Sequence, residues 1–301
     1  MGEPSGIGPE VALRAYEVLG GAIGGRPLTF VGDPALFPGA ASGAVIASRA
    51  CFAEAVPGKA DPANTPAVVD AIDTAVNYAM SGAAGAVVTA PIHKASLLQG
   101  GFEFAGHTEY LAKITGAERA VMMLAGPGLR VVPLTIHIAL SQVPARITKP
   151  ALVETGEIVL AALKRDFAIA EPRLAISGLN PHAGEDGELG PEERDTIAPS
   201  CEALRGFGHT VLGPLPADTM FHAESRARYD AALCMYHDQA LIPLKTLAFW
   251  EGVNVTLGLP IVRTSPDHGT ALDIAGTGKA DARSMIAAIK MAAEIADARN
   301  C

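Results

Sequence analysis

The chain has 301 residues, of which 49% are hydrophobic, 18% charged and 5% aromatic, and its formal net charge is −9. This composition predicts a globular protein of one large or two medium domains, and it argues against a general nucleic-acid binder, which needs clustered basic residues. No apolar run approaches the roughly 18 residues of a membrane span, and the N-terminus lacks the pattern of a signal peptide. Four widely spaced cysteines form no CxxC pair. We therefore expect a cytoplasmic protein with reduced thiols, no nucleic-acid partner and no membrane contact.

Short apolar runs alternate with longer amphipathic segments along the chain. The apolar runs predict buried strands over residues 27–33, 85–91, 130–137, 172–180 and 231–238. Apolar residues at helical spacing predict helices over residues 66–80, 150–166 and 282–298. This alternation favours an α/β fold with a largely parallel sheet. Because ligands bind beyond the carboxyl ends of strands in such sheets, the residues after each run are the first candidates for function.

A glycine-rich loop, GEPSGIGPE, opens the chain at residues 2–10. It either holds a ligand phosphate or forms a sharp turn before a helix. No GK[ST] follows it, so it is not a P-loop, and it does not read GxGxxG, so it is not a Rossmann dinucleotide fingerprint. A bound nucleotide must therefore use another loop.

Three of the eight histidines closely follow predicted strands: His137, His182 and His237. In a parallel sheet all three would lie on the same rim. Three neutral imidazoles with an open position form a catalytic divalent-metal site. Taken alone, each favours a hydrogen-bonded loop or core histidine, because the spacings match no local metal motif, whereas three at equivalent strand ends favour the metal site. His182 follows Pro181 in a segment that we expect to be a stiff loop, neither strand nor helix.

Two further histidines lie next to candidate ligand-binding segments. His107 lies in FAGHTEYLA, where Thr108 can cap a helix that begins at Glu109. This is either a plain helix start or a helix N-terminus that offers His, Thr and backbone N–H groups to an anion. His268 lies in the glycine-rich turn TSPDHGTALDIAGTG, a usual place for a cofactor to touch backbone.

Cationic side chains near strand ends are candidates for binding a phosphate or carboxylate. Lys245 follows His237 in YHDQALIPLK, and Arg263 follows the apolar segment NVTLGLPIV. Lys94, in TAPIHKASL, is a weaker candidate of the same kind. Each is also consistent with an ordinary surface cation.

Seven motifs occur in the order found in PdxA-type enzymes, and the sequence resembles this family along its whole length. They are GEPSGIGPE, TAPIHK, GHTEYLA, GLNPHAGEDGELGPEE, GPLPADTMF, YHDQALIPLK and GVNVTLGLPIVRTSPDHGTALDIAGTGKAD. The resemblance implies a fold similar to isocitrate and isopropylmalate dehydrogenases, with two α/β/α domains around a cleft. The expected division is residues 1–105 plus 265–301, with the cofactor-contacting loop, and residues 106–264, with the metal and substrate site.

The resemblance also implies the site residues and a homodimer whose active site takes ligands from both subunits. The implied metal ligands are His137, His182 and His237. The implied substrate-binding residues are His107, Thr108, Lys245, Asn254 and Arg263. The cofactor-contacting residues are His268, Gly269, Thr270 and Asp273, in a loop similar to the NAD-adenosine loop of the larger group. The general base is open among Asp218, Asp238 and Lys245, with Asp218 favoured.

The implied reaction is an NAD(P)- and divalent-metal-dependent oxidation of 4-phosphohydroxy-L-threonine, followed by decarboxylation to 3-amino-2-oxopropyl phosphate, in pyridoxal 5'-phosphate biosynthesis. Within the family, D-threonate or D-erythronate 4-phosphate and ring dihydrodiols are alternative substrates. A non-catalytic sugar-phosphate sensor and a metal-dependent hydrolase also stay open. The sequence decides neither the metal, among Zn, Mg, Co, Ni and Mn, nor the choice between NAD and NADP.

The family carries an apolar strand before the GEPSGIGPE loop, whereas this sequence begins at Met1, directly before that loop. Two expectations are open: a start site assigned too far downstream, or a strand that is absent. Loss of the strand would leave backbone groups of its neighbours unpaired, at a cost in stability. No predicted ligand lies in that segment.

Overall fold

The structure is a computed structural model that describes residues 1–50, 54–104 and 106–300. It divides into two compact units: unit 1, Met1–Ala120 and Leu259–Asp297, and unit 2, Val121–Gly258 and Ala298–Cys301. The sequence predicts boundaries after residues 105 and 264, and these units have theirs after residues 120 and 258. Tyr110 and Leu111 account for part of the difference, because they pack into the core of unit 1 with Val68 and Ile72.

Unit 2 is built on a mixed, largely parallel sheet with the strand order β11-β6-β7-β10-β8-β9. Strands β7, β10, β8 and β9 run parallel, β6 is antiparallel to β7, and β11 is antiparallel to β6. The strands are β6 (Val121–Gly126), β7 (Leu129–Thr135), β8 (Arg173–Ser177), β9 (Thr210–Leu215), β10 (Ala231–Tyr236) and β11 (Val253–Leu257). The predicted α/β class is therefore confirmed.

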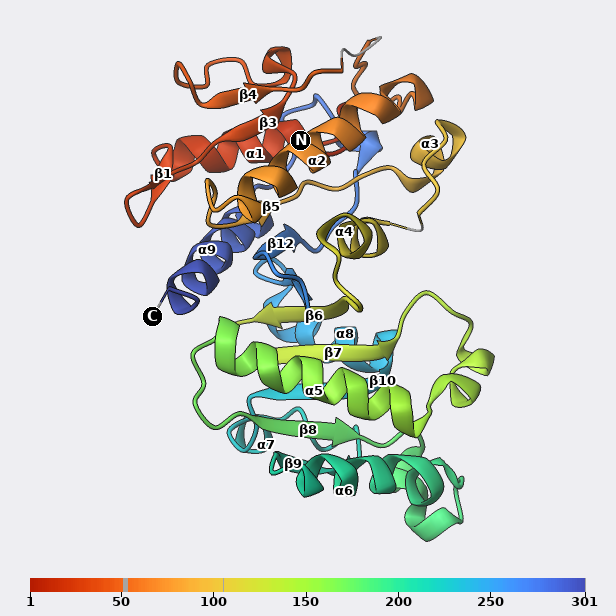
Figure 1. The fold of residues 1–301 in the computed structure, drawn as a ribbon. Coiled ribbons are helices and arrows are strands. Elements are labelled where there is room, and N and C mark those ends of the chain that lie inside the picture. The colour runs from red at the N-terminus through yellow and green to blue at the C-terminus, as the bar shows by residue number, and fades with distance from the viewer. Residues whose placement is uncertain (51–53, 105, 301) are drawn as a thin grey trace. The chain divides into compact units, whose positions relative to one another are not determined.

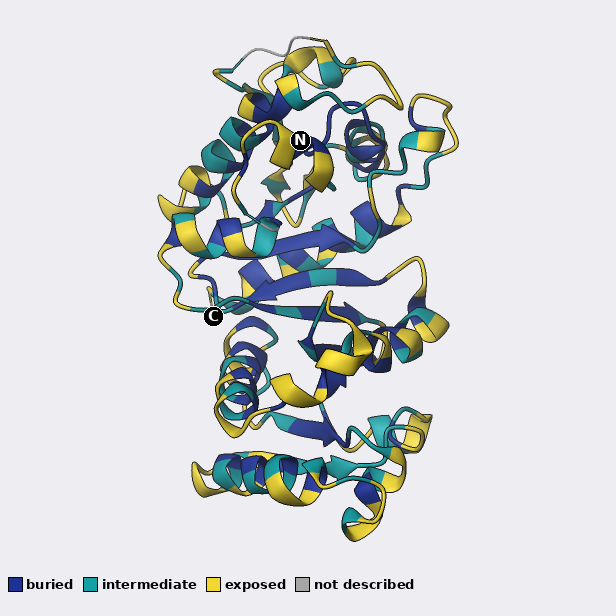
Figure 2. Cartoon of the chain, turned by 90° about the vertical axis from the view of Figure 1, so that its right-hand side faces the viewer, coloured by how far each residue is buried: buried dark blue, intermediate teal, exposed yellow. Residues whose placement is uncertain are grey.

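Helices cover both faces of this sheet. Figure 1 shows α5 in front of the strands and α8 behind them. The α-helices of unit 2 are α5 (Lys149–Asp166), α6 (Ala198–Gly206), α7 (Ala223–Arg226) and α8 (His237–Ala248). Thr148 caps α5 by accepting a hydrogen bond from the Ala151 N–H at 3.3 Å. The strands are mostly buried, whereas exposed residues gather on the outer helix faces (Figure 2).

Unit 1 contains shorter strands. Strand β5 (Val87–Val88) pairs in parallel with β12 (Arg263–Pro266), and β3 (Phe30–Gly32) pairs in parallel with β4 (Val45–Ala47). A small antiparallel pair joins β1 (Ala22–Ile23) and β2 (Arg26–Pro27). The helices are α1 (Gly8–Val18), α2 (Thr65–Met80), α3 (Lys94–Gln99), α4 (His107–Thr115) and α9 (Arg283–Ala298).

The helices predicted over residues 66–80, 150–166 and 282–298 are confirmed as α2, α5 and α9, each to within one residue at either end. The strand prediction for residues 27–33 is only partly right, because β2 and β3 are separate short strands with different partners. No helix in the described ranges is long and apolar enough to cross a membrane.

Two of the cysteines, Cys201 and Cys234, are buried free thiols. Burial raises the pKa of Cys201 to about 11 and that of Cys234 to about 12. Both are therefore protonated near neutral pH and are poor nucleophiles. Cys51 and Cys301 lie outside the described residues.

Candidate active site

His137 and His237 lie close together at the carboxyl edge of the unit 2 sheet. Strands β7 and β10 are parallel neighbours, with Thr135 opposite Tyr236, so the residues that follow them share one edge. The two imidazole rings lie 5.8 Å apart, centroid to centroid, with an angle of 40° between their planes. With metal–nitrogen bonds of roughly 2.0–2.1 Å, two imidazoles on one ion have ring centres about 4.5–6 Å apart. The pair therefore fits two ligands of a shared divalent ion.

A carboxylate orients the His237 ring. Nδ1 of His237 lies 2.7 Å from Oδ1 of Asp238, and the two side chains are 38% and 71% exposed. An ion pair that is this exposed to solvent contributes little stability. It does fix the proton on Nδ1, which leaves Nε2 as the nitrogen able to bind a metal. Asp238, left open as a general base by the sequence, thus has an orienting contact in the structure.

His182 lies on a left-handed turn beyond β8, the other parallel neighbour of β10. The residues with φ between 43° and 81° in this turn are His182, Ala183, Gly184, Glu185 and Asp186, and Gly187 follows with φ 101°. Left-handed backbone costs a non-glycine residue roughly 1–2 kcal/mol. Such strain persists only where the surroundings hold it, and it is typical of functional sites. The prediction of a loop that is neither strand nor regular helix agrees with this geometry.

Within one chain the three histidines do not form a complete ligand set. Across the described ranges, no group of three His, Cys, Asp or Glu side chains is close enough to hold a metal ion. His137 and His237 meet, whereas His182 stands on the adjacent loop at the same edge. The three-histidine site therefore stays a prediction.

Asp218 also lies at this edge, in the exposed turn that follows β9. Because β9 runs parallel to β8, its carboxyl end faces the same way as that of β8. The sequence prediction of Asp218 as general base is therefore compatible with its location, and it stays untested.

Lys245 does not lie beside His237. Both residues belong to α8, where His237 is the first residue and Lys245 follows eight residues later. At 1.5 Å per residue this separates them by about 12 Å along the helix axis. Helix α8 thus carries Lys245 away from the carboxyl edge.

Asn254 lies still farther from the histidines of its own chain. It pairs with Leu124, which is opposite Val131 near the start of β7. Val131 is six residues before His137, a distance of about 20 Å along a strand. The Asn254 Oδ1 atom is nevertheless buried and accepts no hydrogen bond from a described residue. A buried acceptor of this kind calls for a partner from a ligand or water.

In unit 1, the predicted substrate-binding residues His107 and Thr108 begin helix α4. The sequence predicts Thr108 as the cap of a helix starting at Glu109, and this is wrong. The helix starts at His107, because Gly106, with extended backbone at φ 175°, takes the cap position without a side-chain hydrogen bond. Thr108 lies in the first turn, and the N–H groups of that turn remain available to an anion.

Arg263 supplies a buried positive charge to unit 1. Its side chain is 3% exposed, and its Nη2 donates to the Thr89 hydroxyl at 2.6 Å. Burial lowers the pKa of Arg263 to about 10, so it remains cationic at neutral pH. A guanidinium presents several N–H donors in a fixed plane, an arrangement that suits a phosphate or carboxylate oxygen.

His107 lies within the electrostatic reach of this cation. Burial, and then the positive charges of Arg263, the Met1 amine and Lys94, hold the pKa of His107 well below its usual range. The imidazole is therefore neutral at pH 7, and its buried Nε2 has no hydrogen-bond partner among the described residues. Lys94 Nζ lies 3.7 Å from the position of a Cβ built on Gly106, next to His107. Glu109 Oε2 lies 3.6 Å from the same Cβ position, so two cations, one carboxylate and a neutral imidazole surround the start of α4. The backbone N–H groups of a helix start and the two cations are features that suit an anion.

The predicted cofactor-contacting loop follows β12 and packs against the glycine-rich N-terminal loop. Thr270 accepts a hydrogen bond from the Ile7 N–H at 3.0 Å, and a Cβ on Gly6 would stand 2.8 Å from the same carbonyl oxygen. Nδ1 of His268 bonds the Gly269 carbonyl at 2.9 Å, while its buried Nε2 has no described partner. Asp273, also predicted, is exposed. Sequence reasoning missed this contact between two loops at opposite ends of the chain.

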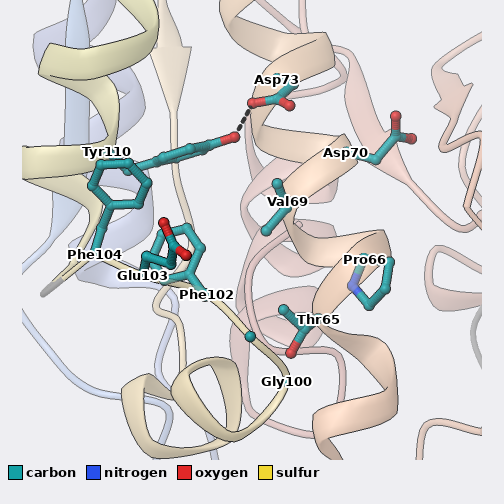
Figure 3. A pocket seen from close by; sticks show the side chains of 11 residues that line it. Thr65, Pro66, Val69, Asp70, Asp73, Gly100, Phe102, Glu103, Phe104 and Tyr110 are labelled. Carbon is teal, nitrogen blue, oxygen red and sulfur yellow. Dashed lines mark hydrogen bonds between the residues drawn. The ribbon is translucent and has the colours of Figure 1, made fainter.

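Unit 1 contains a cavity of about 420 Å³ (Figure 3). It is bordered by α2, the segment Gly100–Phe104 and Tyr110 of α4. The Tyr110 hydroxyl donates to Asp73, and the rings of Phe102, Phe104 and Tyr110 pack on one another. None of the predicted site residues lines it.

Comparison with known proteins identifies the family. Residues 37–292 match the family described as "Pyridoxal phosphate biosynthetic protein PdxA". A curated relative from Paracoccus denitrificans (strain Pd 1222), named 4-hydroxythreonine-4-phosphate dehydrogenase, is 55% identical over 317 aligned residues, covering 99% of this chain and 97% of the relative. A crystal structure of 4-hydroxythreonine-4-phosphate dehydrogenase from Klebsiella pneumoniae is 36% identical, with a TM-score of 0.87 and 98% of each chain covered.

A structure of a terephthalate 1,2-cis-dihydrodiol dehydrogenase from Burkholderia xenovorans LB400 is 30% identical, with a TM-score of 0.69, covering 97% of this chain and 96% of that one. Relatives named for two different substrates thus share the fold. The family match spans well over half of the chain and the relatives match it at near full length, as the order of the sequence motifs implies. The chain belongs to the PdxA family.

Proposed function

We propose that this protein is a 4-hydroxythreonine-4-phosphate dehydrogenase, which oxidises 4-phosphohydroxy-L-threonine with NAD(P) and releases CO2 to give 3-amino-2-oxopropyl phosphate. The observation that carries the proposal is the 55% identity, over 99% of this chain, to a relative of that name. The histidine pair and the cationic group in unit 1 support it, because the reaction needs a site for an alkoxide and a site for a phosphate.

The residues at the carboxyl edge suit metal-assisted oxidation. A divalent ion held by imidazoles supplies Lewis acidity that lowers the pKa of a coordinated hydroxyl, and the nicotinamide accepts the hydride. His137 and His237 would hold the ion with His182, and Asp238 keeps the Nε2 of His237 directed to it. Asp218 at the same edge is our candidate for taking the hydroxyl proton.

The cationic group in unit 1 suits an anionic end of the substrate. Arg263, braced by Thr89, provides a fixed guanidinium, and the start of α4 provides backbone N–H groups with His107 and Thr108. The loop at His268–Asp273 would contact the dinucleotide. A phosphorylated substrate brings an anionic group that these cations can bind, whereas an uncharged diol does not.

We infer that the active protein is a homodimer. Two findings within one chain support this: the described residues gather two imidazoles but no third ligand, and Lys245 and Asn254 lie at the opposite end of the strands. A second copy can supply both. Helix α8 and the residues after it also expose large apolar side chains, among them Ile242 at 64%, Phe249 at 63% and Trp250 at 45%. Exposed apolar clusters of this kind mark protein interfaces.

The dihydrodiol dehydrogenase relative favours a second candidate function within the same chemistry, oxidation of a ring cis-dihydrodiol. Such a substrate carries no phosphate. The two candidates therefore differ in their need for the cations of unit 1. A cytoplasmic location stays a prediction from the sequence.

The test is NADH or NADPH formation with 4-phosphohydroxy-L-threonine and a divalent metal, beside D-threonate 4-phosphate, D-erythronate 4-phosphate and a cis-dihydrodiol. We expect turnover of the first substrate, loss of turnover in His182→Ala, and little change in His209→Ala. His209 is a suitable control because it lies just before β9, at the amino end of that strand, where its ring contacts Glu157 of α5. If another substrate is turned over faster, that substrate replaces 4-phosphohydroxy-L-threonine in the proposal. If neither NADH nor NADPH forms with any of the four substrates, the proposal is overturned.

A further inference from the structure

The left-handed turn that carries His182 has a dedicated support, and the structure assigns this role to Glu193. We propose that Glu193 is the positioning residue that holds the 178–184 loop so that His182 can bind the metal. This inference rests on the proposed function, because it takes His182 as a metal ligand. Glu193 itself is buried, at 4% exposure, and begins a π-helical turn over Glu193–Ile197. Single π turns of this kind are frequent at functional sites.

The Glu193 carboxylate binds the root of the loop from inside. Its Oε1 accepts the backbone N–H groups of Leu179 and Asn180, each at 2.7 Å. Its Oε2 accepts the Asn180 side-chain amide at 2.9 Å. Hydrogen bonds to a charged acceptor are about twice as strong as those between neutral groups. The last residues before Pro181 and His182 are therefore fixed by one buried side chain.

Two glycines allow the turn to close on this carboxylate. A Cβ on Gly184 would stand 2.6 Å from Glu193 Oε2, and a Cβ on Gly178 would stand 2.9 Å from Glu193 Oε1. Gly184 also has φ +81°, in the region that favours glycine. The loop backbone thus packs on both oxygens of Glu193 with no space for a side chain.

The start of the loop is also fixed to β10, the strand that ends just before His237. Gln239, which is 9% exposed, accepts the Met235 N–H at 2.7 Å and the Ser177 hydroxyl at 2.8 Å, and donates to the Gly178 carbonyl at 2.8 Å. Gln239 thereby links the ends of β10 and β8. Gln239 and Glu193 thus fix consecutive residues, 177–180, so the start of the loop that carries His182 is held to the ends of β8 and β10.

Glu193 is suited to positioning and not to metal binding or proton transfer. Both of its oxygens are occupied by loop N–H groups, and the side chain is nearly inaccessible to solvent. Its neighbour Glu192 differs: it is less buried, and its carboxylate accepts a hydrogen bond from the Asn180 side-chain amide at 2.8 Å but none from the loop backbone that the structure describes. The two glutamates therefore form a matched pair, one at the root of the loop and one beside it.

The experiment titrates the metal-free full-length protein with Co²⁺, whose visible absorption reports binding, at a temperature well below the melting point of every variant. The variants are Glu193→Ala, Glu193→Gln, His182→Ala, the double variant, and Glu192→Gln as control. Loss of an outer-shell support typically weakens metal binding about 10- to 100-fold, and we expect this of Glu193→Ala. Glu193→Gln should weaken Co²⁺ binding less than Glu193→Ala does. The glutamine carbonyl oxygen can still accept from the two backbone N–H groups. Some loss remains because the glutamine NH2 group faces the NH2 group of Asn180, so two donors meet. Glu192→Gln should bind like the wild type.

The double variant separates positioning from a general structural effect. If Glu193 acts through His182, then Glu193→Ala causes no further loss of Co²⁺ affinity once His182 is alanine. Equal losses in both backgrounds, or unchanged affinity in Glu193→Ala and Glu193→Gln, would overturn the positioning role while leaving the metal site intact. Wild-type affinity in His182→Ala would instead overturn the ligand assignment on which this inference rests. If Glu193→Ala fails to fold, Glu193→Gln in the same two backgrounds decides the question.

Discussion

His137 and His237 follow neighbouring parallel strands, and their imidazole rings lie 5.8 Å apart at the carboxyl edge of the unit 2 sheet. The register explains this proximity, because Thr135 and Tyr236 are directly opposite and each histidine follows within two residues. His137 reaches its position with φ 52°, a left-handed conformation that a histidine seldom adopts. His137 and His182 are thus both held at positive φ at this edge of the sheet, and strained backbone of this kind is typical of functional sites.

Removal of either imidazole should therefore weaken metal binding. We expect His137→Ala and His237→Ala each to lower Co²⁺ affinity by more than the roughly 10- to 100-fold that loss of an outer-shell partner costs. Titration of the metal-free protein measures this, and His209→Ala serves as control. Wild-type affinity in either variant would remove that histidine from the ligand set.

Asp238 should matter for catalysis more than for stability. Asp238→Asn removes the charge that holds the proton on Nδ1 of His237, so the ring can present the wrong tautomer to the metal. We expect a loss of about 10- to 100-fold in kcat/KM and an unchanged melting temperature, because the pair is exposed. Asp195→Asn, which breaks an exposed pair with Arg194, is the control. Equal activity of the Asp238 and Asp195 variants would refute the orienting role.

The sequence predicts the periodic parts of this fold well. The helices α2, α5 and α9 follow from helical spacing of apolar residues, and the strand ends locate His137 and His237 because parallel strands share a carboxyl edge. Family resemblance adds Asn254, which has no periodic or motif signal of its own. Its buried, unsatisfied Oδ1 becomes visible only when the packing around β11 is known.

Features that depend on tertiary contact were beyond sequence reasoning. Glu193 lies in the quoted motif GLNPHAGEDGELGPEE, yet nothing in the pattern distinguishes it from Glu192. Only burial and the N–H groups of Leu179 and Asn180 do so. The separation of Lys245 from His237 was similarly hidden, because closeness in sequence suggests closeness in space, whereas a helix places the two about 12 Å apart.

The packing of Gly184 on Glu193 predicts an unequal effect of two glycine substitutions. Gly184→Ala and Gly208→Ala both place alanine at positive φ, +81° and +89°, which costs roughly 1–3 kcal/mol. A Cβ on Gly208 meets nothing within 4 Å, whereas a Cβ on Gly184 meets Glu193 Oε2 at 2.6 Å. We expect Gly184→Ala to lower the free energy of unfolding by about 1–3 kcal/mol more than Gly208→Ala, as an additional buried hydrogen bond is lost. Urea denaturation compares them, and equal losses would contradict the tight packing.

The depressed pKa of His107 predicts how stability depends on pH. In the folded protein His107 stays neutral well below its ordinary pKa of 6.5, whereas in the unfolded chain it takes up a proton below that value. The unfolded state therefore binds more protons, and the free energy of unfolding falls as the pH drops below about 6.5, by at most about 1.4 kcal/mol per pH unit from this group. Above that pH the contribution is constant. Urea denaturation between pH 5 and 8 should show a shallower acid slope in His107→Gln than in the wild type, and parallel profiles would contradict the shift.

The exposed apolar side chains on α8 and just after it predict how a charged substitution there affects formation of the proposed homodimer. Ile242 and Phe249 are 64% and 63% exposed, and a homodimer that covers them would have to bury any charge placed there. We expect Ile242→Asp and Phe249→Asp to convert the dimer into monomers in light scattering and to abolish turnover, because Lys245 and Asn254 lie too far from the histidines of their own chain. Phe207→Asp is the matched control, since Phe207 is 64% exposed at the end of α6. A monomeric wild type, or variants that stay dimeric and active, would show that this face is not the interface and that each chain must assemble its site alone.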